Sequence, residues 1–227
     1  MMISTMCKAI TIEKDYEFLF GTLSAKNCKA EDISSELNKY NLAYKNLLKR
    51  KEIQKFNQGT IRKIEITYNW KRKDFNLHIH FLMAVRKQYF KSRHYLSSEK
   101  WLALWQSVMK DETITNIHIQ KAKTTGDSNA YLELAKYSAK TSDLLENGQD
   151  VFNTLMDALT GRQLITYNAI FKEYKKKYVD GELNKYKEID KDLYVFWIHS
   201  VWSLKKQDYE NKITKMDISE TIETSKG

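Results

Sequence analysis

Two alternating segments, joined by a short polar stretch, constrain the fold of this chain more than any other feature. Ile61 to Tyr68 alternates apolar and polar residues, Phe75 to Val85 begins with the same alternation, and residues 69–74 between them are mainly polar or charged. A period of two is typical of strands that bury one face, and a short polar connection joins antiparallel neighbours. The sequence therefore predicts a β-hairpin.

The second arm of this hairpin carries His78 and His80 on either side of Ile79. Successive side chains of a strand point to opposite faces, so the two imidazoles project from one face and Ile79 from the other. Neutral histidine is a common metal ligand, and two on one strand leave coordination positions open for water and substrate. The alternative is a pair of exposed strand histidines with no role.

Glu65 on the first arm is a candidate third ligand. It lies between Ile64 and Ile66, which face the opposite way, so its carboxylate can point to the same polar face as the imidazoles. Two histidines and a carboxylate with open positions suit Mg²⁺ or Mn²⁺ used in phosphoryl chemistry. The alternative is that Glu65 pairs with a surface lysine.

Composition favours a polyanionic partner. The 227 residues include 38 Lys and Arg against 29 Asp and Glu, a net charge of +9, as expected for binding nucleic acid or an anionic surface. The densest apolar run, Leu193 to Leu204, is too short to span a bilayer, and the N-terminus has no signal-peptide pattern. We therefore expect a soluble, cytoplasmic protein without membrane association.

The two cysteines, Cys7 and Cys28, are not spaced like the ligands of a zinc module and are too few for a disulfide framework.

The remaining pattern predicts helices and strands in alternation. We expect strands over 17–24 and 113–121 and helices over 30–51, 98–109, 129–141, 150–159 and 164–175, with Ser97 or Ser98 as the cap of the second helix. Residues 1–16 carry no clear signal, the aromatic run 194–202 fits strand or helix, and a polar tail after about residue 211 is expected to fray. This order predicts an α+β fold, with helices packed on a central antiparallel sheet.

The helix expected over 129–141 carries a second set of reactive side chains. Glu133, Tyr137 and Lys140 lie on one helix face by their spacing of four and three residues. A tyrosine beside a metal-polarised phosphodiester can attack phosphorus, and a nearby carboxylate can activate water to resolve the ester. The alternative is that Tyr137 is a half-buried packing residue.

Taken together in order, these motifs resemble a family. The strand 18–23, Gly59 with 62–69, His78-Ile79-His80, Glu133 with Lys136-Tyr137, Lys140, and the segments 158–162 and 171–173 are similar to the plasmid rolling-circle replication initiators, single-tyrosine members of the HUH endonuclease superfamily. The resemblance covers roughly residues 17–175. It implies an RRM-like palm with the histidines on a central strand.

The resemblance also implies roles for individual residues. His78 and His80 would bind a divalent metal, with Glu65 as our choice of acidic ligand. Tyr137 would nick one DNA strand at a single-stranded or hairpin origin, staying joined to the 5′ phosphate and leaving a 3′ hydroxyl primer. Glu133 would direct water at hydrolytic closure. The partners implied are DNA and a host helicase.

Basic residues supply candidate DNA contacts. Lys136 and Lys140 flank Tyr137, and Arg86 and Lys87 follow the histidine strand, where they are candidates to grip phosphates or form a solvated charge run.

The expected organisation is an unassigned segment over 1–16, a nicking domain over 17–175 and a C-terminal extension over 176–227. The sequence departs from the family pattern at two places. Relatives usually carry a proline just before the first histidine, where this chain has Leu77, and they often carry an N-terminal cysteine cluster, of which only Cys7 remains here.

Three alternatives stay open for the function. They are an HUH transposase or relaxase, a non-catalytic RRM-like nucleic-acid binder and a degenerate initiator.

Overall fold

The computed structural model describes residues 2–122, 134, 148–187, 196–203 and 208–215. The chain divides into two compact units, Met1–Tyr186 and Lys187–Gly227. The helices are α1 (Met2–Lys14), α2 (Ile33–Leu48), α3 (Lys51–Gln54), α4 (Ser98–Met109), α7 (Gln149–Leu159) and α8 (Ile170–Val179), with single 3₁₀ turns η1 (Ala30–Asp32), η2 (Tyr89–Lys91) and η3 (Asn184–Tyr186). The strands are β1 (Tyr16–Ser24), β2 (Gly59–Asn69), β3 (Asp74–Arg86), β4 (Ile117–Lys121), β5 (Ile165–Tyr167), β6 (Phe196–Ser203) and β7 (Asp208–Lys215).

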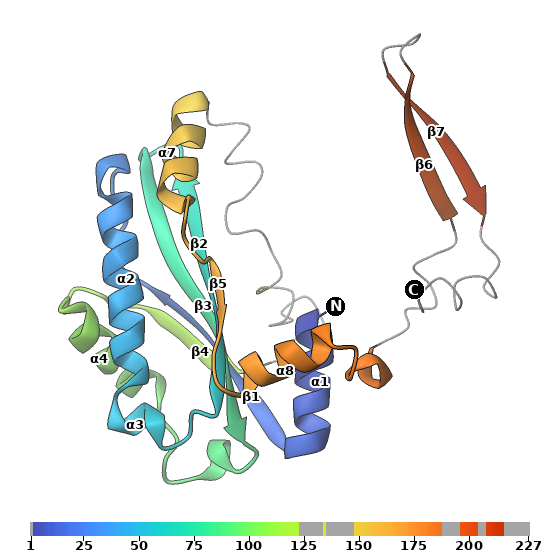
Figure 1. Cartoon of the computed structure of the whole chain (residues 1–227). Helices are drawn as coiled ribbons and strands as arrows, with labels where there is room; N and C mark the ends of the chain where they lie inside the picture. Colours follow the sequence, from blue (N-terminus) through green and yellow to red (C-terminus); the bar gives the residue numbers. More distant parts are fainter. Residues whose placement is uncertain (1, 123–133, 135–147, 188–195, 204–207, 216–227) are drawn as a thin grey trace. The chain divides into compact units, whose positions relative to one another are not determined.

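The first unit is built on a five-stranded sheet in the order β4-β1-β3-β2-β5 (Figure 1). Every pair of neighbouring strands is antiparallel, and β3 is the central strand. The predicted hairpin is therefore confirmed, with β2 and β3 as its arms. The register places Glu65 opposite His78 and Lys63 opposite His80, while Thr22 of β1 lies on the other side of His80.

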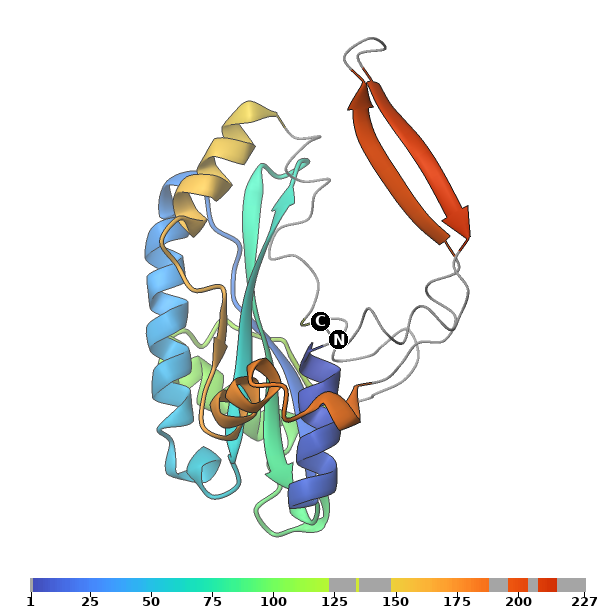
Figure 2. The same cartoon turned by 45° about the vertical axis from the view of Figure 1, so that its right-hand side comes forward.

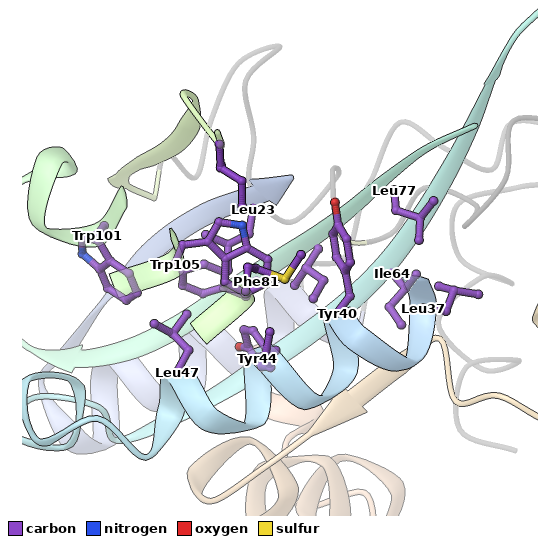
Figure 3. Close-up of a cluster of buried hydrophobic side chains, with 14 of the residues drawn as sticks. Leu23, Leu37, Tyr40, Tyr44, Leu47, Ile64, Leu77, Phe81, Trp101 and Trp105 are labelled. Carbon is purple, nitrogen blue, oxygen red and sulfur yellow. The ribbon is translucent and has the colours of Figure 1, made fainter. Parts of the chain in front are cut away.

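Helices α2, α4 and α7 cover one face of the sheet. Their apolar side chains pack on alternate residues of the strands and form the larger core cluster, part of which Figure 3 shows. Trp101 and Trp105 of α4 are fully buried there, and the Trp105 indole N–H donates to the carbonyl of Ser24 at 2.9 Å. Gly21 permits this packing, since a Cβ at that position would lie 2.3 Å from the Phe81 ring.

Helices α1 and α8 cover part of the opposite face, as both views show (Figures 1 and 2). Their apolar side chains pack on Phe18 and Phe20 of β1 and on Leu82 and Ala84 of β3. This is the face from which the two histidines project, because side chains two apart on a strand share a face. Residues 1–16, which carried no clear signal, thus contain a helix that builds this second core.

Most of the predicted elements are confirmed. The strand expected over 17–24 is β1, and the helix expected over 98–109 is α4, whose N-cap Ser97 accepts a hydrogen bond from the Lys100 N–H. The helix expected over 150–159 is α7. An α+β fold with helices on both sides of a central antiparallel sheet is therefore confirmed.

The prediction of one helix over 164–175 was wrong. Its first part is β5, which pairs with the outer edge of β2, and α8 begins only at Ile170. Asn168 marks the change, because its side-chain oxygen accepts a hydrogen bond from the Thr60 N–H at 2.9 Å. The hydrogen-bonding edge of β2, which lies about 100 residues away in the sequence, decides the conformation of this segment.

Two further expectations are corrected in extent. The helix expected over 30–51 begins as η1, ends as α2 at Leu48 and resumes as the short α3, and the strand expected over 113–121 begins only at Ile117. The helix expected over 129–141 lies outside the described residues except for Leu134, which is helical and buried.

The second unit contains a two-stranded antiparallel hairpin of β6 and β7. Residues 196–202 of the aromatic run that fitted strand or helix therefore belong to a strand. Pairing of β7 continues to Lys215, opposite Phe196, so the first residues after 211 belong to a strand. The rest of the tail that was expected to fray, residues 216–227, lies outside the described residues.

Candidate functional site

Glu65, His78 and His80 form a compact group on the two central strands. Their candidate ligand atoms all lie within 4.8 Å of one another, and the two imidazole centroids are 5.9 Å apart. The strand alternation explains the arrangement, since the hairpin register sets Glu65 beside His78 and the two histidines share a face. Within the described part of the chain, no other group of three or more His, Cys, Asp or Glu side chains converges in this way.

His80 is held from three sides. Its Nε2 lies 2.8 Å from Glu65 Oε2, and its Nδ1 lies 3.0 Å from Thr22 Oγ1. The Phe20 ring stacks on the imidazole with a centroid separation of 6.1 Å and an interplanar angle of 15°. Only 8% of His80 is exposed. The ring orientation is therefore fixed before any ligand binds.

The group's electrostatics favour a negatively charged Glu65. Burial raises the pKa of this carboxyl, but the hydrogen bond with His80 and the charges of His80, Lys63 and His78 outweigh burial and bring the pKa below its ordinary value. Lys63 itself is fully buried and lies directly opposite His80 in the hairpin. An ionised carboxylate is the form that can coordinate a cation.

The donor set fits a divalent cation. Two imidazole nitrogens and one carboxylate oxygen converge from adjacent strands, and a set of three protein ligands leaves positions open for a substrate oxygen and water. The contact between Thr22 and His80 Nδ1 also agrees with metal binding, because a ligating histidine usually forms a hydrogen bond through its second ring nitrogen. Glu65, His78 and His80 are thus the residues that could hold a metal.

The expected nucleophile segment lies outside the described residues. This applies to Glu133, Lys136, Tyr137 and Lys140. Leu134 is described and is fully buried in the core cluster that α1 and α8 form on the histidine face of the sheet.

Arg86 and Lys87 are not brought together with the metal-ligand candidates. Arg86 ends β3, six residues beyond His80, which corresponds to about 20 Å along the strand. Lys87 forms an ion pair with Asp15 at 3.0 Å, and this interaction raises its pKa. Both side chains lie at the opposite end of β3 from the hairpin turn.

Thr22 and Lys63 were missed by the sequence reasoning. Lys63 had a usable signal, because once Glu65 is set opposite His78 the hairpin register must set Lys63 opposite His80. Thr22 had none, since its contact depends on the register between β1 and β3, and Thr22 and His80 are 58 positions apart in the sequence.

The fold and the site define an α+β protein with a two-histidine, one-carboxylate group on the central strands of an antiparallel sheet, suited to metal binding. Comparison with known proteins identifies its family. Residues 2–209 match the Rep_1 family, described as replication proteins. The chain therefore belongs to this family, and the resemblance to plasmid replication proteins is confirmed.

Several curated relatives support this membership. A "Protein rep" from Staphylococcus aureus is 40% identical over 146 residues, covering 64% of this chain and 63% of the relative. A "Protein rep" from Lentilactobacillus hilgardii is 32% identical over 213 residues, 86% of this chain and 68% of the relative. The matched part spans only about half, 54%, of a "Protein rep" from Streptococcus pneumoniae. No solved structure matches the chain.

No described helix has both the length and the apolar character that crossing a membrane requires.

Proposed function

We propose that this chain initiates plasmid replication as an HUH-type endonuclease, nicking one DNA strand at the origin. The observation that carries the proposal is the convergence of Glu65, His78 and His80 on the central strands of a replication protein. The sheet with helices on both faces agrees with an RRM-like palm. The net charge of +9 favours the DNA partner.

Tyr137 is the proposed nucleophile. Its phenolic O–H loses a proton as the oxygen attacks the scissile phosphorus, the bond from phosphorus to the 3′ oxygen breaks, and that 3′ oxygen takes up a proton to become the hydroxyl of the primer. The 5′ phosphate stays on the tyrosine as an ester. When bound, Mg²⁺ or Mn²⁺ would supply Lewis-acid polarisation of the scissile phosphate. Glu65, His78 and His80 are the residues that would hold it.

The burial of Leu134 supports this assignment. Leu134 packs on the histidine face of the sheet, and three peptide units separate Tyr137 from it by at most about 11 Å. This short chain distance from a residue buried on the histidine face supports the proposal that Tyr137 is the nucleophile. Glu133 is adjacent in sequence to the same anchor and would direct water at hydrolytic closure.

Basic side chains would complete the DNA contacts. Lys136 and Lys140 are close in sequence to the nucleophile and would neutralise phosphate charge near it. Arg86 and Lys87 would act farther along the DNA, since they lie at the other end of β3. A host helicase would follow the nick.

Conversion of Tyr137 to phenylalanine tests the proposal. With a labelled single-stranded oligonucleotide carrying the origin hairpin of the replicon and Mn²⁺, the unaltered protein should form a covalent adduct with the 5′-phosphate end that the nick creates. Tyr137→Phe should lower adduct formation at least about 1,000-fold while DNA binding persists. Denaturing electrophoresis measures the adduct.

Tyr131→Phe is the matched control, since it removes the same hydroxyl from a neighbouring tyrosine, and it should retain the adduct. Chelation of the metal should also remove the adduct. Adduct formation by Tyr137→Phe at the native rate would contradict the assignment of Tyr137 as the nucleophile. Binding of the oligonucleotide by the native protein without cleavage would contradict the proposed endonuclease activity.

A further inference from the structure

The turn between β2 and β3 exposes a tryptophan. Trp70 is 66% exposed, whereas Trp101 and Trp105 are fully buried in the core. Other tryptophans fall among residues whose side chains are not described, so Trp70 is the exposed indole of the described part of the chain. About two thirds of this side chain is therefore open to contact with a partner.

Cations surround this indole. Lys71, Arg72 and Lys73 follow it directly, and Lys71 Nζ lies 5.3 Å from the centre of the Trp70 ring. Lys29 adds a fourth positive charge, because its ammonium donates to the carbonyls of Arg72 and Lys73 at 3.2 and 3.3 Å. These four cations and Trp70 are called the hairpin tip below.

Hydrogen bonds fix the conformation of the hairpin tip. Asn69 Oδ1 accepts from the backbone N–H groups of Lys71 and Arg72 at 3.1 and 3.0 Å, and the Asn69 carbonyl accepts from the Lys73 N–H at 2.7 Å. Asp74 at the start of β3 accepts from Asn27 at 2.8 Å and pairs with Arg72 at 3.0 Å. A turn ordered in advance loses little entropy on binding a ligand.

The hairpin tip lies near the metal-ligand candidates. Glu65 is four residues before Asn69 on β2, and His78 is four residues after Asp74 on β3, so each lies about 13 Å along its strand from the turn. A DNA strand whose phosphate is placed at the histidines can therefore reach the tip within a few nucleotides.

We propose that the hairpin tip binds single-stranded DNA next to the nicking site. An unpaired base stacks on the Trp70 indole, and Lys71 and Lys73 contact flanking phosphates. An exposed aromatic ring between cations is the pattern that single-strand binders use, and only an unpaired base offers a free face to it. This inference rests on the proposed function for the identity of the DNA and adds the surface that holds the strand.

Replacement of Trp70 tests the stacking contact. The probe is a fluorescein-labelled 20-nucleotide oligothymidine, with binding measured by anisotropy at several salt concentrations on the full chain. Trp70→Ala should weaken binding about 5- to 100-fold, and Trp70→Phe should lose less. Neither variant should change the slope of log affinity against log salt, because no charge is removed. Leu42→Ala, at a 60% exposed position of α2, is the matched control.

Removal of charge tests the phosphate contacts. Lys71→Gln combined with Lys73→Gln should reduce the salt slope by about 1.4, or 0.7 for each phosphate contact. Lys39→Gln with Lys45→Gln removes the same charge from exposed positions of α2 and should leave the slope almost unchanged. An equal loss of slope in both pairs would show a diffuse charge effect and would contradict the tip contact.

A second probe separates stacking from other effects. A 20-nucleotide abasic oligomer keeps the phosphates and lacks the bases, so the native protein should prefer oligothymidine over it, and Trp70→Ala should reduce that preference. Unchanged binding by Trp70→Ala, or an equal loss with both probes, would overturn the inference. Neither measurement needs cleavage, so a failure of origin nicking would reject the proposed function without deciding the result at the tip.

Discussion

At the scale of single residues, the site depends on how His80 is oriented. Its two ring nitrogens have different neighbours, with Glu65 at Nε2 and Thr22 at Nδ1. If Nε2 is the atom that faces a cation, the Thr22 hydroxyl is the acceptor that keeps the proton on Nδ1, so Thr22 is a positioning residue. Such hydrogen bonds around a ligating histidine set both its tautomer and its basicity.

Thr22→Val should weaken Mn²⁺ binding by about 10- to 100-fold, because the substitution keeps the shape of the side chain and removes the hydrogen bond to Nδ1. Thr22→Ser keeps the hydroxyl and should restore most of the affinity. Isothermal titration calorimetry on the full chain measures this, with the thermal midpoint as a check on folding. Equal affinities for the valine and serine variants would contradict a positioning role.

The metal-ligand candidates could be predicted because each relation among them is local in the hairpin. Glu65, His78 and His80 follow from alternation and one turn, which together fix the register. Thr22 could not be found this way. The alternation of residues predicts which side chains share a face of a strand, but it does not predict which distant strand pairs with it. The roles of Tyr137 and Glu133 stay predictions.

At the scale of elements, α1 and β5 are two segments whose conformation the hydrophobic pattern of the sequence did not predict. Neither has a strong period of its own: α1 mixes Ser and Thr with Met, Cys and Ile, and β5 has only three residues. Packing on Phe18 and Phe20 selects the buried side of α1, and the edge of β2 selects the strand conformation of β5. Long helices such as α2 and α4 could be predicted, because the spacing of their apolar residues alone indicates a helix and its buried face.

Glu13 links α1 to the end of the first unit. Its carboxylate accepts hydrogen bonds from the hydroxyls of Tyr174 and Tyr186 at 2.7 and 2.8 Å. The bond from Tyr174, followed by that from Tyr186, lowers the pKa of Glu13 below its ordinary value of 4.5. A carboxylate with a depressed pKa contributes stability that is present above pH 4.5 and is lost as the pH falls through the folded-state pKa.

Glu13→Gln should lower the free energy of unfolding by about 1 kcal/mol at pH 7, since two charge-assisted hydrogen bonds become neutral ones. The difference from the native protein should shrink as the pH is lowered from 5 to 3, because the native carboxyl then becomes neutral too. Urea unfolding at a series of pH values measures this, with the exposed Glu52→Gln as control. A difference that stays constant between pH 7 and pH 3 would contradict the role of the charge.

At the scale of the whole molecule, the two units differ in construction. The first has two cores, one on each face of its sheet, and holds the candidate metal group and the hairpin tip. The second contains a two-stranded hairpin, and an isolated hairpin is only marginally stable in water. The stability of the first unit should therefore not depend on the second.

A protein that ends at Tyr186 should unfold cooperatively, with a thermal midpoint within about 5 °C of the full chain, and should bind Mn²⁺ with unchanged affinity. A protein that ends at Asn168 is the comparison, because it lacks Phe171 and Tyr174 of the second core and should be strongly destabilised. Circular dichroism and calorimetry measure both. Loss of cooperative unfolding in the longer truncation would show that the first unit requires the second.

The contact between α1 and α8 also has a consequence for timing during synthesis. Glu13 and Tyr174 are separated by 161 residues, so at about 5–20 residues per second the ribosome makes Tyr174 roughly 10–30 s after Glu13. Over that interval α1 lacks the aromatic partners that complete its core. A polypeptide released from the ribosome before this point lacks these partners and cannot close the histidine face of its sheet.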